Sequence, residues 1–234
     1  MIRKLYSYFK IYGPKRFLEN MVGELKMLKR GPLYNSYSQN SEDILIDRLL
    51  GNKKTGFYVD VGAYDPSRLS NTKRFYKRGW SGINIETDPR KIIKFHKLRT
   101  RDLNLNVGIA NKNGRLWYFE FEPDTLSTFS KQAAENYKRQ GYKLVGTFKI
   151  PVLKLGGVLE KYSKSKRIDF ISVDVEGYDL EVLKSNNWKM FKPRLICVEA
   201  DESSEKNIDK FLARIGYKMV CRNHNNLIFL LKKR

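Results

Sequence analysis

Five acidic residues mark the places in the sequence where chemistry is expected: Asp60, Glu86, Asp174, Glu176 and Glu199. Each lies at or just past the end of an apolar, β-favouring run. Because the carboxyl ends of parallel strands share one edge of an α/β sheet, we expect these carboxylates to lie near one another. Asp174 and Glu199 end neighbouring predicted strands. They could bind a hard cation such as Mg²⁺ through oxygen, or one could remove a proton from a substrate hydroxyl.

A turn of small residues follows the first of these strands. Gly62 and Ala63 come directly after Asp60-Val61, and small residues let the backbone approach a ligand closely. Glu86 lies roughly 25 residues beyond this loop, near the ~20 expected for an acid that receives ribose hydroxyls. A carboxylate accepts two hydroxyl hydrogen bonds well. The pattern therefore favours a nucleotide-type cofactor between the loop and Glu86.

Strand-like and helix-like segments alternate along the chain. Strands are predicted at 57–61, 82–86, 103–107, 168–173 and 193–198, and helices at 69–78, 88–99, 131–140, 155–162 and 209–215. Asn113-Gly114 predicts a hairpin turn, and the segments 217–221 and 227–231 predict a closing hairpin. The alternation indicates an α/β, doubly wound sheet, mostly parallel, with a C-terminal antiparallel hairpin.

Composition indicates a globular protein with an unusual charge. Of 234 residues, 41% are hydrophobic and 13% aromatic, which suits one folded domain. Lys and Arg outnumber Asp and Glu by 46 to 25, for a formal charge of +21, and this predicts attraction to phosphates, acidic glycans or anionic lipids. No basic block with interleaved aromatics is present, so specific nucleic-acid binding is not favoured. Cys197 and Cys221 are expected to be reduced, buried thiols.

The first 34 residues form a separate segment, broken near Gly13-Pro14. Apolar residues recur there at helical spacing among basic ones, which predicts a basic amphipathic arm before a domain at 35–234. Such an arm could lie on an anionic membrane, or pack on its own domain or a partner subunit. Neither a signal peptide nor a stretch of ~18 apolar residues is visible. We therefore expect a cytoplasmic protein. The alternative is a cytoplasmic protein that contacts the inner membrane surface peripherally.

From Ser38 to Leu230 the sequence resembles the FkbM family of S-adenosylmethionine-dependent methyltransferases. Several separate motifs occur in the family's order, and together they make the resemblance specific. They are the segments 38–43, 58–63, 70–72, 78–80, 82–86, 127–129 and 168–177. One position departs from the common form: Tyr64 stands where many members carry Asn or His.

The resemblance implies a class I methyltransferase sheet, S-adenosylmethionine as methyl donor, and usually O-methylation. It implies that Asp60, Gly62 and Ala63 line the methionine end of the cofactor and that Glu86 holds the ribose. By the same resemblance Asn106, Val107 and Gly108 lie near the adenine, Gln39 and Asn71 reach the same pocket, and Asp174 and Glu176 line the reacting end.

We therefore expect an O-methyltransferase acting on a sugar, glycan or other small polar acceptor, as in polysaccharide biosynthesis. Asp174 or Glu176 would act as base or metal ligand, with Glu199 assisting, and His224 is a further candidate base if the closing turn faces the same edge. The acceptor site is expected from the segment 122–149 and the closing hairpin. One alternative is an RNA methyltransferase, suggested by the charge but disfavoured because the strand ends Asp174-Val175-Glu176. The other is a catalytically silent scaffold that docks on a membrane.

Overall fold

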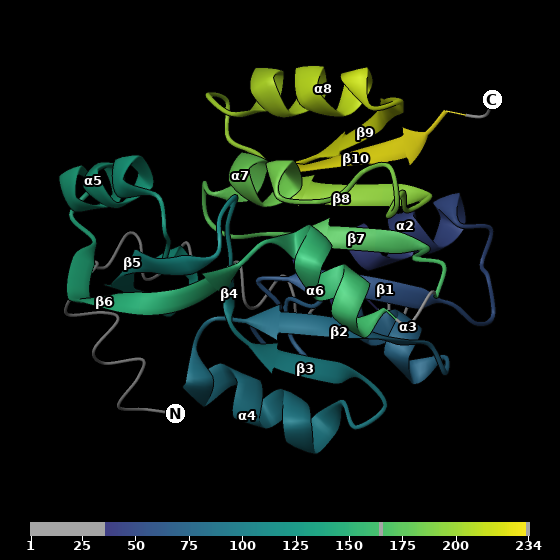
Figure 1. The fold of residues 1–234 in the computed structure, drawn as a ribbon, viewed down its shortest axis with the longest axis horizontal. Coiled ribbons are helices and arrows are strands. Elements are labelled where there is room, and N and C mark those ends of the chain that lie inside the picture. Colours follow the sequence, from purple (N-terminus) through teal and green to yellow (C-terminus); the bar gives the residue numbers. More distant parts are fainter. Residues whose placement is uncertain (1–35, 164–165, 233–234) are drawn as a thin grey trace. The chain divides into compact units, whose positions relative to one another are not determined.

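The computed structural model describes residues 36–163 and 166–232, and a seven-stranded sheet is its centre (Figure 1). The strand order is β3-β2-β1-β7-β8-β10-β9. The strands are β1 (Phe57–Val61), β2 (Ser81–Glu86), β3 (Leu103–Asn106), β7 (Phe170–Val173), β8 (Leu195–Glu199), β9 (Tyr217–Asn223) and β10 (Asn226–Leu231).

Strands β3, β2, β1, β7 and β8 run parallel, and β10 is antiparallel to both β8 and β9. The expected mostly parallel α/β sheet with a closing antiparallel hairpin is confirmed. The chain moves outward from β1 to β3 and then returns to β7 on the other side of β1. This reversal makes a topological switch point between β1 and β7, where open α/β sheets bind ligands.

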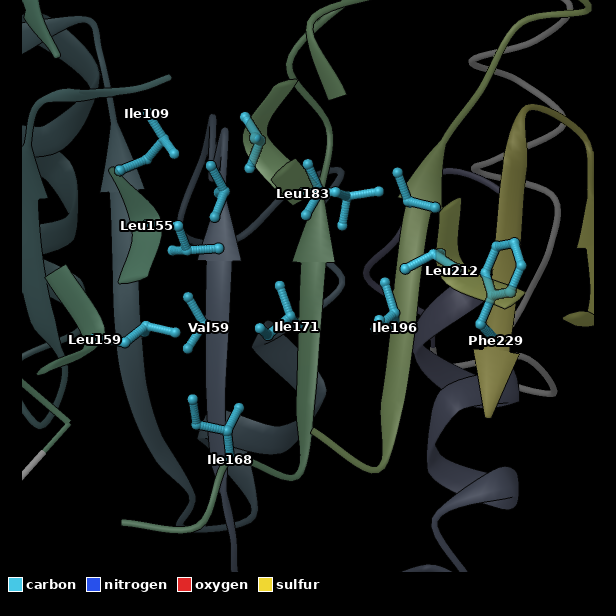
Figure 2. Close-up of a cluster of buried hydrophobic side chains, with 14 of the residues drawn as sticks. Val59, Ile109, Leu155, Leu159, Ile168, Ile171, Leu183, Ile196, Leu212 and Phe229 are labelled. Atoms are coloured by element: carbon cyan, nitrogen blue, oxygen red, sulfur yellow. The ribbon is translucent and has the colours of Figure 1, made fainter. Parts of the chain in front are cut away.

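Helices cover both faces of this sheet. They are α2 (Glu42–Leu49), α3 (Lys73–Lys77), α4 (Pro89–Leu98), α6 (Leu155–Tyr162), α7 (Asp179–Lys184) and α8 (Glu205–Arg214). On one face, side chains such as Val59, Ile171 and Ile196 pack against α6, α7 and α8 (Figure 2). On the other, Tyr58 and Phe170 pack against α2 and α3. All five residues of β1 are buried, as expected for a central strand covered on both faces.

A second, three-stranded sheet is inserted between β3 and β7. It contains β4 (Gly108–Ile109), β5 (Gly114–Glu122) and β6 (Lys143–Leu153) in the order β4-β6-β5, with a 3-10 turn η1 (Asp124–Leu126) and helix α5 (Lys131–Arg139) between β5 and β6. The hairpin predicted at Asn113-Gly114 is wrong, because the long alternating partner of β5 is β6, whereas β4 contributes only two residues and pairs with β6 in parallel.

The helix predicted at 69–78 is also too long, since α3 begins only at Lys73. Leu69 has a left-handed backbone with φ of 50°, which a helix cannot contain. Ser70 Oγ instead accepts a hydrogen bond from the Lys73 amide at 3.2 Å. The residues before α3 are thus freed to form a loop that reaches the pocket described below.

The predicted arm at 1–34 lies outside the described residues. Within residues 36–163 and 166–232, no helix combines the length and apolar character needed to cross a bilayer.

Candidate active site

A pocket opens at the switch point between β1 and β7 and encloses about 830 Å³, counting the space at its mouth. One wall comes from the ends of the central strands and the loops that follow them. The other comes from the inserted sheet, through Tyr118, Asp124, Thr125 and the segment 127–129. The remaining lining residues are Gln39, Glu42, Gly62, Tyr64, Leu69, Asn71, Glu86, Thr87, Lys91, Asp174, Val175, Glu176 and Asn226.

The loop after β1 touches the end of β7 at Gly62. Its φ is 79°, and a Cβ placed there would stand 1.8 Å from the carbonyl oxygen of Asp174. The Gly62 and Ala63 amides both donate to the Ile85 carbonyl, at 3.0 and 3.1 Å. The backbone at Gly62 is therefore held close to the ends of both β2 and β7, and only glycine fits at this point.

Glu86, at the end of β2, is 5% exposed and anchors the same loop. Its two oxygens each accept a backbone amide at 2.8 Å, one from Tyr64 and the other from Asp88. Burial raises the pKa of Glu86, while nearby Lys91 and these amides partly offset that rise. Each carboxylate oxygen keeps one lone pair for a ligand, so Glu86 can accept a pair of hydroxyl groups.

Asp60 lies beneath the loop rather than in the pocket wall. It is 5% exposed and accepts a hydrogen bond from the Thr72 hydroxyl at 2.8 Å. Burial raises the pKa of Asp60 to about 6, and the Thr72 hydrogen bond and Arg99 act in the opposite direction.

Arg99 holds this loop from below and is fully buried. Its guanidinium donates to the Pro66 carbonyl at 2.9 Å and to Ser70 Oγ at 3.0 Å, and it lies 3.6 Å from the carboxylate of Asp102. The segment that carries Asn71 into the pocket is therefore fixed by a buried cation. Asn71 Nδ2 in turn donates to Ser172 Oγ on β7 at 3.0 Å.

Asp174, Glu176 and Glu199 form a compact acidic cluster. One carboxylate oxygen from each lies within 4.8 Å of the others, and all three side chains are partly exposed. The negative charge of Asp174 raises the pKa of Glu199 to about 12, and loss of surrounding water adds to it. Glu199 therefore keeps its proton near neutrality and donates a hydrogen bond to Asp174.

The loop after β7 is held from two sides. Asp179 accepts the amides of Val175 and Gly177 at 3.1 and 3.0 Å, which shapes a tight turn. Glu176 has φ of 55° in this turn and receives the Tyr137 hydroxyl on Oε2 at 2.9 Å. Burial is the main cause that raises the pKa of Glu176 well above its ordinary range, and Asp174 adds to it.

The structure brings six of the expected site residues into the pocket wall: Gln39, Gly62, Asn71, Glu86, Asp174 and Glu176. Asp60 and Ala63 are buried behind it, and Glu199 reaches the site through its contact with Asp174. Asn106, Val107 and Gly108, expected near an adenine, do not line this cavity. Asn106 instead donates to the Glu86 and Thr87 carbonyls, both at 2.9 Å. His224 is exposed on the closing turn and is not part of the lining.

Three of the lining residues that the sequence analysis did not name as site residues, Glu42, Tyr64 and Lys91, hold the pocket together through their contacts. Glu42 is fully buried and accepts the Asn223 and Asn226 amides at 3.1 and 3.3 Å, which fastens the closing hairpin to α2. Its signal in the sequence was its place in the segment 38–43, one of the motifs that carry the family resemblance. Lys91 had none, being one of 46 basic residues.

Tyr64, noted only as a departure from the family form, joins the two walls of the pocket. Lys91 Nζ stands 4.3 Å from the centroid of the Tyr64 ring and donates to the Asp124 carbonyl at 3.3 Å. The Tyr64 hydroxyl also donates to Asp124 Oδ1 at 3.3 Å. The large side chain thus ties the loop after β1 to η1 across the pocket.

The seven-stranded order, the glycine loop after β1 and the acid that ends β2 define a class I methyltransferase sheet with a cofactor pocket at its switch point. The family described as "Methyltransferase FkbM domain" matches residues 60–219. Since the match spans more than half of the sequence, the chain belongs to the FkbM methyltransferase family, and this membership implies S-adenosylmethionine as the methyl donor.

Several solved structures are similar to this chain at low sequence identity. The METTL16 methyltransferase domain is 14% identical with a TM-score of 0.47, and the match covers 81% of this chain but only 65% of that domain. A precorrin-6y C5,15-methyltransferase from Geobacter metallireducens is 13% identical (TM-score 0.40, covering 82% of this chain and 87% of that one). A putative RNA methyltransferase from Pyrococcus horikoshii is 12% identical (TM-score 0.43, covering 83% of each). No curated protein sequence matches the chain.

Proposed function

We propose that this methyltransferase acts on oxygen, transferring a methyl group to a hydroxyl of a sugar, glycan or other small polar acceptor. The observation that carries the proposal is the cluster of Asp174, Glu176 and Glu199 in the pocket. O-methylation needs a group that takes the hydroxyl proton, and a carboxylate beside the acceptor can do so.

The residues present suit S-adenosylmethionine. Gly62 leaves backbone exposed where a side chain would collide, and Glu86 has lone pairs for the two ribose hydroxyls. When bound, the cofactor supplies an electrophilic methyl group on a sulfonium and a neutral thioether as leaving group. The protein has to place the acceptor oxygen in line and manage its proton.

The three acids of the cluster have different roles in proton transfer. Because Glu199 keeps its own proton, it is not the base in the cation-free protein. Burial raises the pKa of both Asp174 and Glu176, which makes each ionised carboxylate a stronger base, while the hydrogen bonds from Glu199 and from the Tyr137 hydroxyl act in the opposite direction. Asp174 or Glu176 therefore accepts the acceptor's proton, and Glu199 orients Asp174.

Mg²⁺ would offer a second route at the same place. Three carboxylate oxygens this close together can supply a hard cation with ligands, and a bound cation would replace the proton on Glu199. It would also lower the pKa of an acceptor hydroxyl. Under this route Asp174 and Glu199 serve as ligands.

The experiment is methyl transfer from labelled S-adenosylmethionine to a panel of monosaccharides, oligosaccharides and RNA, run with Mg²⁺ and with a chelator. The proposal predicts label in a base-stable methyl ether of a carbohydrate. Asp174→Asn should cut the rate of transfer while leaving S-adenosylhomocysteine affinity within a few-fold of wild type. Label found only in RNA bases would contradict the proposal, and chelator sensitivity would select the metal route.

A further inference from the structure

Exposed apolar side chains concentrate on the inserted sheet. Within residues 36–163 and 166–232, eight large apolar side chains stand exposed: Ile93, Leu98, Trp117, Val145, Phe148, Leu153, Met190 and Val220. Four of these eight lie on β5 and β6, and two of the four, Trp117 and Leu153, belong to the same side of the sheet, whereas Phe148 pairs with Tyr118 on the other side. Trp117 alone is 53% exposed. Exposed apolar groups gathered on one element mark an interaction surface more often than scattered ones do.

The pairing of β5 with β6 defines one outward face. Arg115 lies opposite Pro151, and Trp117 lies opposite Lys149. Because side chains alternate along a strand, Leu153 shares this side. We call these five residues the ribbon face. The neighbouring Leu116, Tyr118 and Ile150 point the other way and pack around Phe129.

The ribbon face itself carries two cations, Arg115 and Lys149, and no acidic residue, and further lysines lie in the segments around it. The segments 110–118 and 143–159 contain five cations and no Asp or Glu; the cations are Lys112, Arg115, Lys143, Lys149 and Lys154. Of these, Lys143 pairs with Glu122 at 3.4 Å. Lys149 Nζ lies 5.0 Å from the centroid of the Trp117 ring, so a cation and an aromatic form one unit in the middle of the face.

We propose that the ribbon face docks on an anionic lipid membrane. Indole rings settle at the boundary between headgroups and acyl chains, and lysine and arginine extend from there to the phosphates. Leu153 and Pro151 add aliphatic area that a headgroup layer can cover. Each cation near an anionic surface adds attraction that falls with salt.

The same geometry disfavours a nucleic acid as the occupant. Single-stranded bases bind by stacking on the flat face of an aromatic ring. On Trp117 the Lys149 ammonium stands over the ring, so a base would have to displace it. A membrane interface accepts the ring and the ammonium together. The inference goes beyond methyl transfer and does not depend on it.

The molecule contains its own reporter for this docking. Of the three tryptophans, Trp80 is 0% exposed and Trp188 is 9% exposed, whereas Trp117 is 53% exposed. Only Trp117 can therefore change its surroundings when the folded protein meets a surface. We would titrate the full chain with vesicles of phosphatidylcholine and phosphatidylglycerol, and with phosphatidylcholine alone. Tryptophan emission would be followed with and without brominated acyl chains.

We expect a blue shift and bromine quenching with the anionic vesicles only. In co-sedimentation, W117A/K149A should lower the partition coefficient at least about ten-fold. The matched control K189A/M190A removes one exposed lysine and one exposed apolar side chain elsewhere, with Met190 61% exposed. It should bind like wild type. Circular dichroism would check that both variants are folded.

Each other outcome overturns the proposal. Vesicle binding without quenching, or equal loss in both double variants, would assign membrane contact to another part of the basic chain. A blue shift that grows with protein concentration in the absence of vesicles would assign the face to a second copy of the chain. Absence of any vesicle binding would exclude a membrane as the occupant.

Discussion

Replacing Glu86 by Gln tests the cofactor site at its most constrained carboxylate. Both oxygens of Glu86 accept a backbone amide at 2.8 Å, and the group is 5% exposed. A glutamine amide can accept only one of these N–H groups, because its nitrogen faces the other donor. A buried donor left unpaired costs about 1–3 kcal/mol, so we expect the free energy of unfolding to fall by that amount.

Cofactor binding should fall as well. Losing a hydrogen bond from a ribose hydroxyl to a charged acceptor costs about 1.5–3 kcal/mol, which corresponds to a roughly 10- to 150-fold rise in Kd. Because the ribose is common to both ligands, S-adenosylmethionine and S-adenosylhomocysteine should be affected equally. Burial raises the pKa of Glu86, so the difference between Glu and Gln should shrink as the pH falls toward that pKa.

The assay is calorimetric titration with both ligands, paired with urea unfolding. Glu160→Gln is the matched control, since Glu160 is exposed on α6 and outside the pocket lining. The Glu160→Gln variant should change neither the ligand affinity nor the free energy of unfolding. Wild-type affinity for both ligands in Glu86→Gln would refute the ribose assignment. A loss confined to S-adenosylmethionine would place Glu86 near the sulfonium instead.

Three further predictions concern the loop after β1. Gly62→Ala would place a Cβ 1.8 Å from the Asp174 carbonyl oxygen and should cost more than about 2 kcal/mol in urea unfolding. Gly157→Ala, with no atom within 4 Å of its Cβ position, should instead stabilise α6 slightly; equal effects would contradict the loop geometry. The pKa of Asp60 is raised from 3.8 to about 6, so the folded state binds this proton more tightly and stability falls as pH rises through about 6. Asp60→Asn should therefore raise Tm more at pH 8 than at pH 5. A larger gain at pH 5 would contradict the raised pKa of Asp60. Arg99→Met leaves the fully buried Asp102 carboxylate without its cation and should cost about 3–5 kcal/mol; a loss below about 1 kcal/mol would show that Arg99 is not what holds the loop.

The sequence was most informative where one residue type has one physical use. Gly62 needs a positive φ and close backbone contact, and Glu86 ends a buried strand at the interval expected for a ribose acid. The convergence of Asp174, Glu176 and Glu199 followed from the parallel sheet, because the ends of β7 and β8 lie side by side.

The site residues and strand pairings that the sequence did not indicate depend on contacts between distant segments. Tyr137 reaches Glu176 from an inserted helix 39 positions earlier, and nothing local in α5 marks it. Lys91 was indistinguishable from the other lysines until the fold placed it over Tyr64. The Asn113-Gly114 pair carried a genuine turn signal, but β5 had a longer partner in β6. Pairing partners of strands are set by the whole sheet, which local patterns do not contain.

Calorimetric titration of the folded full chain with S-adenosylmethionine tests the central claim most directly. The account predicts saturable one-to-one binding with micromolar affinity, lost or strongly weakened when Glu86 is replaced by Ala. Absence of binding in a protein shown to be folded, or wild-type affinity in Glu86→Ala, would contradict the assignment of the pocket between β1 and β7 as the cofactor site.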